Sequence, residues 1–340
     1  MSNSSIITNN IKVGIVLFRH CSLWSATGSR EMLLRANKAR AYFFPSSQGS
    51  TFEVEYVLPE KAARDDFPSS APMESMHEQT HWDWIILPGF DHPPQSVLDE
   101  NRDVTPWIRE QHARGAKIAS ICTGSFFLAA AGILNGKTAT THWLVADTFR
   151  QLFPEVPFLK EKILIDHGSI LISGGATSFH NLMIHLLEQY MGRKVAIGVS
   201  KLYLIDLRKD SQESYAVFTG HKGHQDTKIS EIQNYIETHF AEKLTLDMIA
   251  QKACMSKRNF IRRFKAATGV TPYAYIQKMR VEAAKEMLET VSGSIQEVVF
   301  KTGYEDLDAF RQVFIKHTGV TPSAYRKKYN PDFYLAPHLQ

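Results

Sequence analysis

Short apolar runs alternate with amphipathic stretches over the N-terminal part of the chain. Runs rich in Val, Ile and Leu, which favour buried strands, lie at residues 12–18, 84–89 and 117–121, and residues 52–58 show the polar–apolar alternation of a strand. Shorter strands are expected at residues 138–140, 163–166 and 171–173. Helices are expected at residues 26–38, 104–114, 125–131 and 178–191. This alternation predicts an α/β domain with a flavodoxin-like, layered and mainly parallel sheet, in which the polar residues 60–80 form a loop.

The pattern is different near the C-terminus, where one segment occurs twice. Residues 260–272 are echoed by residues 310–322, and both copies contain Thr-Gly-Val-Thr-Pro. Each copy places two Phe residues one helical turn apart, on a face that should be core. Ser256 and Asp306 precede the copies as good N-caps, and the Gly followed by Pro is a stop signal. Each copy is therefore predicted to be a helix with marked ends.

A shorter helix is expected before each repeated helix, at residues 247–253 and 296–302. Tight turns at residues 254–255 and 303–305 separate the two members of each pair. A short helix, a tight turn and a second helix with a polar outer face form the helix-turn-helix pattern. A predicted long helix at residues 273–290 joins the two pairs, so we expect an all-α domain with two helix-turn-helix units.

Positive charge is concentrated in this repeated region. Residues 228–330 contain 17 Lys and Arg against 11 Asp and Glu, a net charge of +6, whereas the whole chain carries +4. A phosphate-binding surface requires such a concentration of basic side chains.

The outer faces of the two repeated helices carry side chains that suit DNA. Since Arg to guanine is the commonest specific base contact, base contacts are expected from Arg258, Arg262, Arg311 and Gln312, with Asp308 reading cytosine or orienting Arg311. Phosphate contacts are expected from Lys257, Lys265, Arg280 and Lys316, and Asn259 completes the predicted surface. The alternative is a helical bundle whose charged faces are only solvated. The duplicated caps, stops and bridge favour DNA binding.

A second candidate site lies in the α/β domain, where a predicted buried strand meets a helix. Cys122 on that turn can project at the carboxyl edge of the sheet, where α/β folds bind ligands. The first N–H groups of the helix can lower the pKa of a thiol and hold an anion. The candidate ligand pocket comprises Cys122, Thr123, Gly124, His142, Ser25 and Gly89. Cys122 could be a thiol buried for packing, part of a pocket lining, or a nucleophile. His142 could be structural or line the pocket.

Residues 244–325 resemble the DNA-binding domain of the AraC/XylS family. The resemblance rests on matching positions in both copies and in the bridge: Ile249, Ala250, Met255, Ser256, Phe260, Arg263, Phe264, Gly269, Pro272, Arg280, Ala283, Ala284, Gly303, Tyr304, Phe310, Phe314, Gly319, Pro322, Tyr325 and Arg326. It implies two recognition helices that enter successive major grooves of double-stranded DNA, about 34 Å apart. Cys254 departs from the family, which usually has Gly at this turn, and we expect backbone strain of about 1 kcal/mol there.

Residues 11–192 resemble the PfpI-type, class I glutamine-amidotransferase-like domain. The matching residues are 87–89, 121–124, Leu128, Ala129, Ala131, Gly132 and 139–143. The two domains together resemble the GlxA subfamily of AraC-type transcriptional regulators. This resemblance implies a sequence-specific regulator, more often an activator, whose first domain senses a small metabolite. It also implies a homodimer that works with RNA polymerase.

Three departures from the PfpI-type pattern argue against catalysis. Ser25 stands where the enzymes carry an acidic residue that polarises the thiol, and Thr123 follows the cysteine where protease-like members often have His. Asn181 replaces the Asp usual in the regulators. A Cys–His pair without an orienting third group is poorly supported as a catalyst, so we expect no enzyme. The rivals are a cysteine-dependent hydrolase or amidotransferase-like enzyme carrying a DNA-binding module, and a purely architectural DNA-binding protein.

Composition and the polar stretches indicate the domain boundaries and the cellular compartment. We expect a sensor domain at residues 11–205, a linker at 206–227 and a DNA-binding domain at 228–330 of the 340 residues. Three scattered cysteines fit a reducing cytoplasm rather than a disulfide framework or a zinc site. No cofactor or metal is expected, and His221 and His224 in the linker are expected to be solvated. The polar N-terminus is not expected to be a signal peptide, and no apolar run approaches the roughly 20 residues that cross a bilayer.

Overall fold

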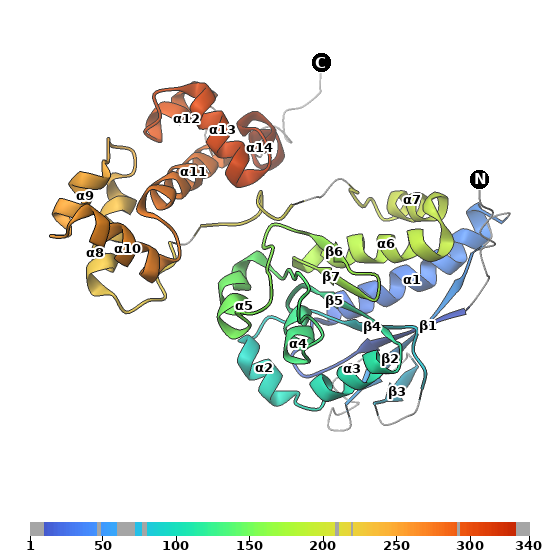
Figure 1. Cartoon of the computed structure of the whole chain (residues 1–340). Coiled ribbons are helices and arrows are strands. Elements are labelled where there is room, and N and C mark those ends of the chain that lie inside the picture. Colours follow the sequence, from blue (N-terminus) through green and yellow to red (C-terminus); the bar gives the residue numbers. More distant parts are fainter. Residues whose placement is uncertain are drawn as a thin grey trace, which may run out of the picture. The chain divides into compact units, whose positions relative to one another are not determined.

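A computed structural model describes residues 10–45, 49–59, 72–76, 80–207, 211–218, 220–290 and 293–330. The chain divides into two compact units, Met1–Gln212 and Glu213–Gln340 (Figure 1). None of the helices in the described part of the chain is both long and apolar enough to span a bilayer.

The first unit is built on a seven-stranded sheet with the strand order β3-β2-β1-β4-β5-β7-β6. Its strands are β1 (Asn10–Val16), β2 (Thr51–Leu58), β3 (Met73–Ser75), β4 (Trp84–Leu87), β5 (Lys117–Ile121), β6 (Leu164–Asp166) and β7 (Ile170–Ser173). All neighbouring pairs are parallel except β6 and β7. The β-branched, apolar sequences of β1, β4 and β5 suit strands covered on both faces. The predicted α/β fold with a mainly parallel sheet is confirmed.

Two local predictions about strands were wrong. The structure places no strand at residues 138–140, where Ala139 makes only an isolated bridge to Phe158. Residues 60–80 were expected to be a loop. They include β3, which pairs with β2 and forms one edge of the sheet. Most of that stretch lies outside the described residues. Edge pairing is not visible in sequence because it depends on a partner strand distant in the chain.

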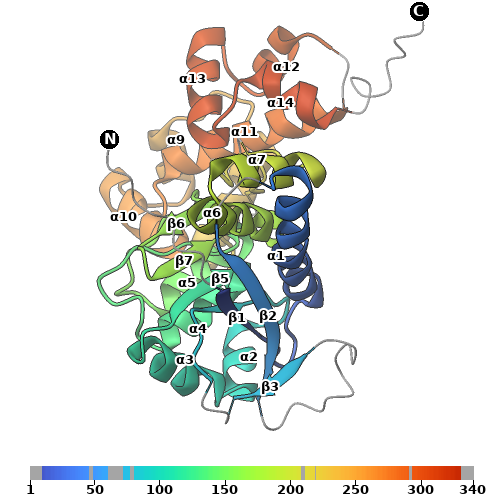
Figure 2. The same cartoon turned by 90° about the vertical axis from the view of Figure 1, so that its right-hand side faces the viewer.

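Helices cover both faces of the sheet (Figures 1 and 2). One face packs against α1 (Leu23–Phe43), α6 (Phe179–Met191) and α7 (Arg193–Leu202). The other packs against α2 (Pro94–Glu100), α3 (Val104–Ala113), α4 (Ser125–Ala130) and α5 (Ala146–Leu152). The result is a three-layer α/β/α unit in which the carboxyl ends of β1, β4 and β5 meet at one edge of the sheet.

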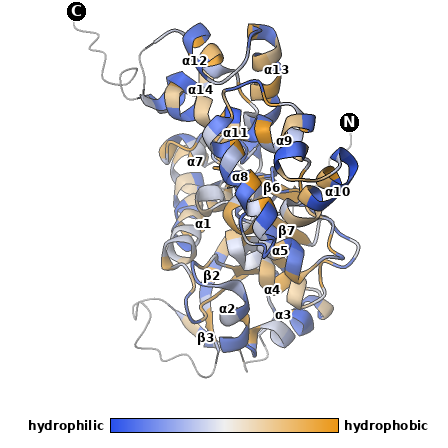
Figure 3. Ribbon diagram, turned by 90° about the vertical axis from the view of Figure 1, so that its left-hand side faces the viewer, coloured by the Kyte–Doolittle hydropathy of each residue, from blue (hydrophilic) through white to orange (hydrophobic). Residues whose placement is uncertain are grey.

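The regular secondary structure in the described part of the second unit is all helical. Its helices are α8 (Thr227–His239), α9 (Leu246–Lys252), α10 (Lys257–Thr268), α11 (Pro272–Thr290), α12 (Ile295–Lys301), α13 (Leu307–Thr318) and α14 (Pro322–Tyr329). Hydrophobic and hydrophilic residues alternate along these ribbons in Figure 3. One core lies among α8–α11 and a second among α11–α14. Because α11 contributes buried residues to both cores, it joins the two halves, as the sequence predicted.

The segment predicted as a linker, residues 206–227, is shared between the units. Gln212 lies in the first unit, where its backbone N–H donates to the carbonyl oxygen of Glu161 at 2.7 Å. From Glu213 onward the chain belongs to the second unit.

Candidate nucleic-acid interface and ligand site

Each half of the second unit forms a helix-turn-helix with matching ends. The side chain of Ser256 accepts a hydrogen bond from the Asn259 N–H at the start of α10, and Asp306 accepts one from the Ala309 N–H at the start of α13. Both helices end at a glycine in the left-handed region, with φ of 75° and 71°. These are the cap and stop geometries that the repeated sequence predicted.

The two turns contain a second matched pair, Cys254 and Gly303. Cys254 has φ 55° and Gly303 has φ 81°. A Cβ on Gly303 would lie 2.5 Å from the carbonyl oxygen of Ala241, so only glycine fits there. The first turn has the same left-handed backbone with a cysteine in it, which is the position of strain that the sequence predicted.

Most of the predicted DNA contacts lie on exposed faces of the two second helices. α10 exposes Lys257, Arg258, Asn259, Arg262 and Lys265, and α13 exposes Asp308, Arg311, Gln312 and Lys316. Arg258, Arg262 and Lys265 are spaced so that they share one face of α10. Two of the α10 side chains have protein partners in this structure. Lys257 pairs with Asp247 at 2.9 Å, and Arg262 donates to the Asn259 side chain at 3.1 Å.

Arg280 is placed differently from the other predicted contacts. Its Nε donates to the carbonyl oxygen of Phe240 at 2.8 Å, and its terminal nitrogen donates to that of Glu242 at 2.9 Å. The guanidinium also lies over the ring of Tyr304, 5.3 Å from the centroid. Arg280 therefore ties the end of α8 to the second half of the unit, a structural role that the sequence did not reveal.

One ion pair in this unit was missed by sequence reasoning. Arg263 on α10 donates two hydrogen bonds to Asp226, at 2.6 and 2.9 Å. Asp226 also caps α8 by accepting from the Ile229 N–H. The hydrogen bond and charge of Arg263 lower the pKa of the Asp226 carboxyl below its usual range. This bidentate pair fixes α10 to the start of α8. The sequence can suggest the helix cap at Asp226 but not its pairing with Arg263.

In the first unit, Cys122 occupies the turn between β5 and α4. Its φ is 55°, a left-handed conformation that is strained for a side chain with a Cβ. Gly124 and Gly89 allow this turn to approach the end of β4. A Cβ on Gly124 would lie 2.6 Å from the carbonyl oxygens of Leu87 and Pro88, and one on Gly89 would lie 3.0 Å from the Cys122 Cβ. The two glycines thus serve close packing at the carboxyl edge of the sheet.

The Cys122 thiol is buried, with 7% of the residue exposed. Burial raises the pKa of the thiol to about 11, against smaller opposing effects of the Thr123 N–H and hydroxyl and the Gly175 N–H. The Thr123 hydroxyl itself donates to the carbonyl oxygen of Phe90 at 2.7 Å. The hydroxyl of Ser25 donates to the carbonyl oxygen of Ser22 and accepts from the Gly89 N–H. A neutral, buried thiol is a poor nucleophile.

His142 caps a short helical turn just beyond the same edge of the sheet. Its Nδ1 accepts a hydrogen bond from the Leu144 N–H at 3.2 Å, and burial lowers the pKa of its imidazole. Its neighbour Thr141 donates to the carbonyl oxygen of Cys122 at 3.0 Å. The structure thus brings the segment containing His142 against the cysteine turn. Among the described residues, no group of three or more His, Cys, Asp or Glu is arranged to hold a metal ion.

Gln212 is a further residue of this site that sequence reasoning missed. It is 4% exposed, and its side-chain amide donates to the carbonyl oxygens of Thr141 and Lys162, each at 2.9 Å. Its amide oxygen accepts from the Trp143 N–H at 3.3 Å. No local signal marks this residue, because its partners lie 50 to 71 positions earlier in the chain.

Comparison with protein families gives the same division. Residues 47–189 match the DJ-1/PfpI family, and residues 249–328 match a helix-turn-helix domain family. The fold and the two sites therefore define a DJ-1/PfpI domain followed by an AraC-type helix-turn-helix domain.

Related proteins align with much of this chain. The HTH-type transcriptional regulator GlxA of Rhizobium meliloti is 24% identical over 336 residues, covering 96% of this chain and 99% of GlxA. The HTH-type transcriptional regulator GbdR of Pseudomonas aeruginosa is 27% identical over 246 residues, covering 72% of this chain and 66% of GbdR. CdhR of the same species is 27% identical over 230 residues, covering 66% and 68%. The homologues of this chain are thus HTH-type transcriptional regulators, GlxA and GbdR among them.

Proposed function

We propose that this protein is a sequence-specific, ligand-responsive transcriptional regulator. The observation that carries the proposal is the pair of helix-turn-helix units, capped alike and joined by α11, each of which exposes basic and polar side chains on its second helix. In this arrangement α10 and α13 enter successive major grooves of double-stranded DNA. Arg258, Arg262, Arg311 and Gln312 read base edges, Asp308 reads cytosine or orients Arg311, and Lys257, Asn259, Lys265 and Lys316 support the backbone contacts.

The first unit is proposed to bind a small effector near Cys122 and His142. The support is a turn held at the carboxyl edge of a parallel sheet, the usual ligand edge of such folds, beside a histidine with a lowered pKa. The remaining parts of the proposal come from the resemblance to AraC-type regulators: a homodimer, contact with RNA polymerase, activation of transcription and a cytoplasmic location. No cofactor is required for any of these steps.

A sensor is favoured over an enzyme on chemical grounds. A cysteine-dependent hydrolase or amidotransferase needs a thiolate, and burial keeps the Cys122 thiol protonated by raising its pKa to about 11. The hydroxyl of Ser25, bonded to the backbone of Ser22 and Gly89, stands where a carboxylate would act on the thiol.

The test is a salt-titrated selection of the full-length protein on a random-sequence duplex pool. Enrichment of a defined sequence with a steep loss of affinity in salt is expected. Arg258→Ala and Arg262→Ala should each cost about 1–3 kcal/mol on the selected site and relax preference at one position. Lys265→Ala should weaken binding to all sequences and reduce the salt slope by about one.

The matched control is Lys301→Ala, which removes an exposed lysine on α12 rather than on a recognition helix. It should leave sequence preference unchanged. Selection of no sequence by the unaltered protein would refute the proposed function, and an unchanged preference in Arg262→Ala would refute the placement of α10.

A further inference from the structure

Gln212 contacts the segments that surround the candidate effector site. Its side chain bonds the backbone of Thr141 and Trp143, the residues on either side of His142. It also fills the space beside Gly174, where a Cβ would lie 2.1 Å from the Gln212 amide nitrogen. The next residue, Gly175, supplies the N–H that faces the Cys122 thiol. Gln212 therefore contacts both loops that flank the cysteine turn.

The chain is anchored again two residues later, in the second unit. The Tyr329 hydroxyl on α14 donates to the carbonyl oxygen of Ser214 at 3.1 Å. The ammonium of Lys328 lies 3.8 Å from the ring centroid of Tyr215. Ser214 is buried and Tyr215 packs against the Tyr329 ring at 6.3 Å. We call the segment formed by residues 213–218 and 220–226 the strap, because it continues along the DNA-binding unit.

The strap follows α11 from the second half of the unit to the first. The ammonium of Lys285, a residue 4% exposed, donates to the carbonyl oxygen of Ala216. The ring of Phe218 then packs against Tyr275, 5.1 Å between centroids, in the core of the first half. A cavity of about 640 Å³ lies beside this first part of the strap, lined also by α11 and α14 residues. The first part is thus held by a few specific contacts rather than by a dense core.

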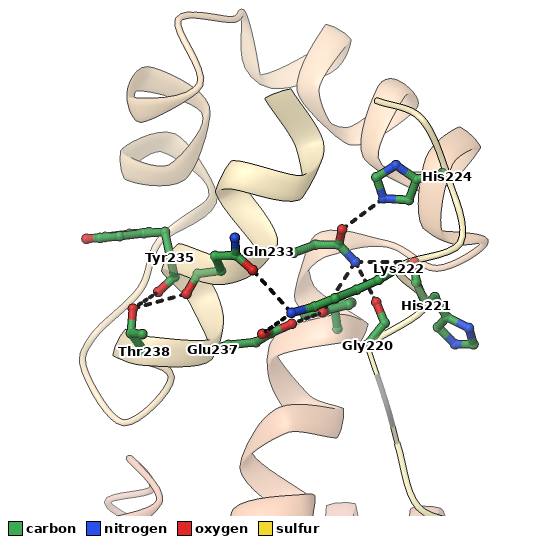
Figure 4. A network of polar contacts seen from close by, with 10 residues as sticks. Gly220, His221, Lys222, His224, Gln233, Tyr235, Glu237 and Thr238 are labelled. Carbon is green, nitrogen blue, oxygen red and sulfur yellow. Dashed lines mark hydrogen bonds and ion pairs between the residues drawn. The ribbon is translucent and has the colours of Figure 1, made fainter. Parts of the chain in front are cut away.

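The second part of the strap is bound to α8 (Figure 4). The Gln233 amide donates to the carbonyl oxygen of Gly220, and its oxygen bonds the His224 ring at 2.8 Å. Lys222 pairs with Glu237 at 2.7 Å. The strap ends at Asp226, whose carboxylate holds Arg263 on the recognition helix α10 (above). One continuous segment therefore runs from the effector site, through Gln212, to a recognition helix.

We propose that Gln212 is a latch that couples the Cys122 site to the DNA-binding unit, an inference that rests on the proposed regulatory function. The latch is closed when Gln212 keeps its hydrogen bonds to the first unit. The chain between the anchors at Gln212 and Ser214 then spans only about 7 Å. The latch is open when the side-chain bonds of Gln212, its backbone bond to the Glu161 carbonyl oxygen and the bridge between Ser211 and Lys162 are all released. The tether can then extend back to Ile205, whose N–H donates to the Ser200 carbonyl oxygen at 2.8 Å. The tether then reaches about 30 Å.

A ligand can open or close the latch only if it binds the two states differently. The loops that hold Gln212 are the loops around Cys122 and His142, so a ligand that displaces either loop changes the hydrogen bonds of the latch directly. The length of the tether limits where each DNA-binding unit can be placed relative to the other copy on DNA. A short tether fixes where a second copy of the DNA-binding unit can sit, and a long tether does not.

The test compares the same Gly-Ser-Gly-Ser insertion at two places in the full-length protein. Inserted between Gln212 and Glu213, it lengthens the tether while leaving both anchors intact. Inserted after Leu207, it lies between two anchors of the first unit and leaves the tether unchanged. The readouts are small-angle X-ray scattering of the free protein and binding to duplexes that carry two copies of the selected sequence at varied spacing.

The insertion after Gln212 should increase the maximum dimension by about 10 Å. It should also reduce a spacing preference of about tenfold or more to less than about threefold. The insertion after Leu207 should change neither readout. If the two insertions behave alike in scattering, residues 206–227 act as a plain flexible linker and the latch is refuted.

A side-chain variant tests the latch residue itself. Gln212→Ala combined with the insertion after Leu207 removes the side-chain bonds of the latch and leaves only the backbone bond to Glu161 and the bridge at Ser211, so it should expand the protein where the insertion alone does not. The matched control is Asn101→Ala, which removes a buried amide of the first unit that bonds Arg19 and Val97 instead. An equal expansion in Asn101→Ala would show that general loosening of the unit, not the latch, is responsible.

The scattering arm needs neither a DNA site nor a dimer. If the unaltered protein selects no DNA sequence, the proposed function fails while the scattering result still decides whether the latch exists. If DNA selection succeeds and the two insertions give the same scattering, the proposed function is supported and the latch is refuted.

Discussion

The chemistry of Cys122 separates a sensor from a cysteine enzyme, and it can be measured without knowing any ligand. Burial raises the pKa of its thiol to about 11. At pH 7.5 about 0.03% of such a thiol is ionised, against about 9% of a free thiol with a pKa near 8.5. The thiolate is the reactive form. Ionisation alone therefore slows alkylation of Cys122 about 300-fold relative to free cysteine, and burial of the sulfur slows it further.

The assay is alkylation of the folded protein by iodoacetamide, followed residue by residue with mass spectrometry. Cys254 is exposed and serves as the internal reference. The rate at Cys122 should be at least about 100-fold lower than at Cys254 at pH 7.5. It should keep rising about tenfold per pH unit up to about pH 10, because the thiolate fraction does so. In denaturant the two cysteines should react at similar rates.

A protonated Cys122 thiol is excluded if Cys122 reacts faster than Cys254 near neutral pH, or if its rate of alkylation reaches a plateau below pH 8. Either result would mean a stabilised thiolate in the folded protein. The hydrolase or amidotransferase interpretation would then be preferred, and Cys122→Ser should abolish turnover of an amide or ester substrate.

Further predictions concern the stability of the second unit. Gly303→Ala should lower the free energy of unfolding by about 2–4 kcal/mol, because the new Cβ meets the Ala241 carbonyl oxygen at 2.5 Å on a left-handed backbone. Cys254→Gly should be neutral or stabilising by up to about 1 kcal/mol, since it relieves the left-handed strain; urea unfolding followed by far-UV circular dichroism measures both, and a larger loss in Cys254→Gly than in Gly303→Ala would contradict this account. Because Arg263 lowers the pKa of Asp226, their pair stabilises the fold above about pH 4 and its contribution is lost as the pH falls through the lowered pKa. Asp226→Asn should therefore be less stable at pH 7 and lose less stability between pH 5 and pH 3, and an unchanged pH dependence of unfolding would exclude this role.

The local signals in the sequence were sufficient for the two helix-turn-helix units. Caps, glycine stops and the spacing of buried Phe residues each act within one or two helical turns. Residues such as Ser256, Gly269 and Phe264 therefore indicate a helix and its ends from the local sequence alone. The strained turn at Cys254 was also expected, because the family that the sequence resembles usually has Gly at this turn. The parallel sheet followed in the same way from apolar runs separated by helical stretches.

Edge strands and the partners of single polar side chains were not predictable. The acceptors of Arg280 at Phe240 and Glu242 appear only when α11 packs against the end of α8, and the predicted phosphate contact of Arg280 stays a prediction. The chemical state of Cys122 depends on how completely β5, α4 and the neighbouring loops exclude water.

The sequence by itself therefore determined the central strands of the sheet, the paired helices of the two helix-turn-helix units, and the domain types that the chain joins. The tertiary structure decided what the polar residues between those segments do. Gln212, in a stretch that reads as linker, bonds residues 50 and 71 positions away and contacts the loops around Cys122. The physical reason is that helix caps and periodicity are short-range in the chain, whereas burial and hydrogen bonding of a side chain depend on neighbours brought together only by folding.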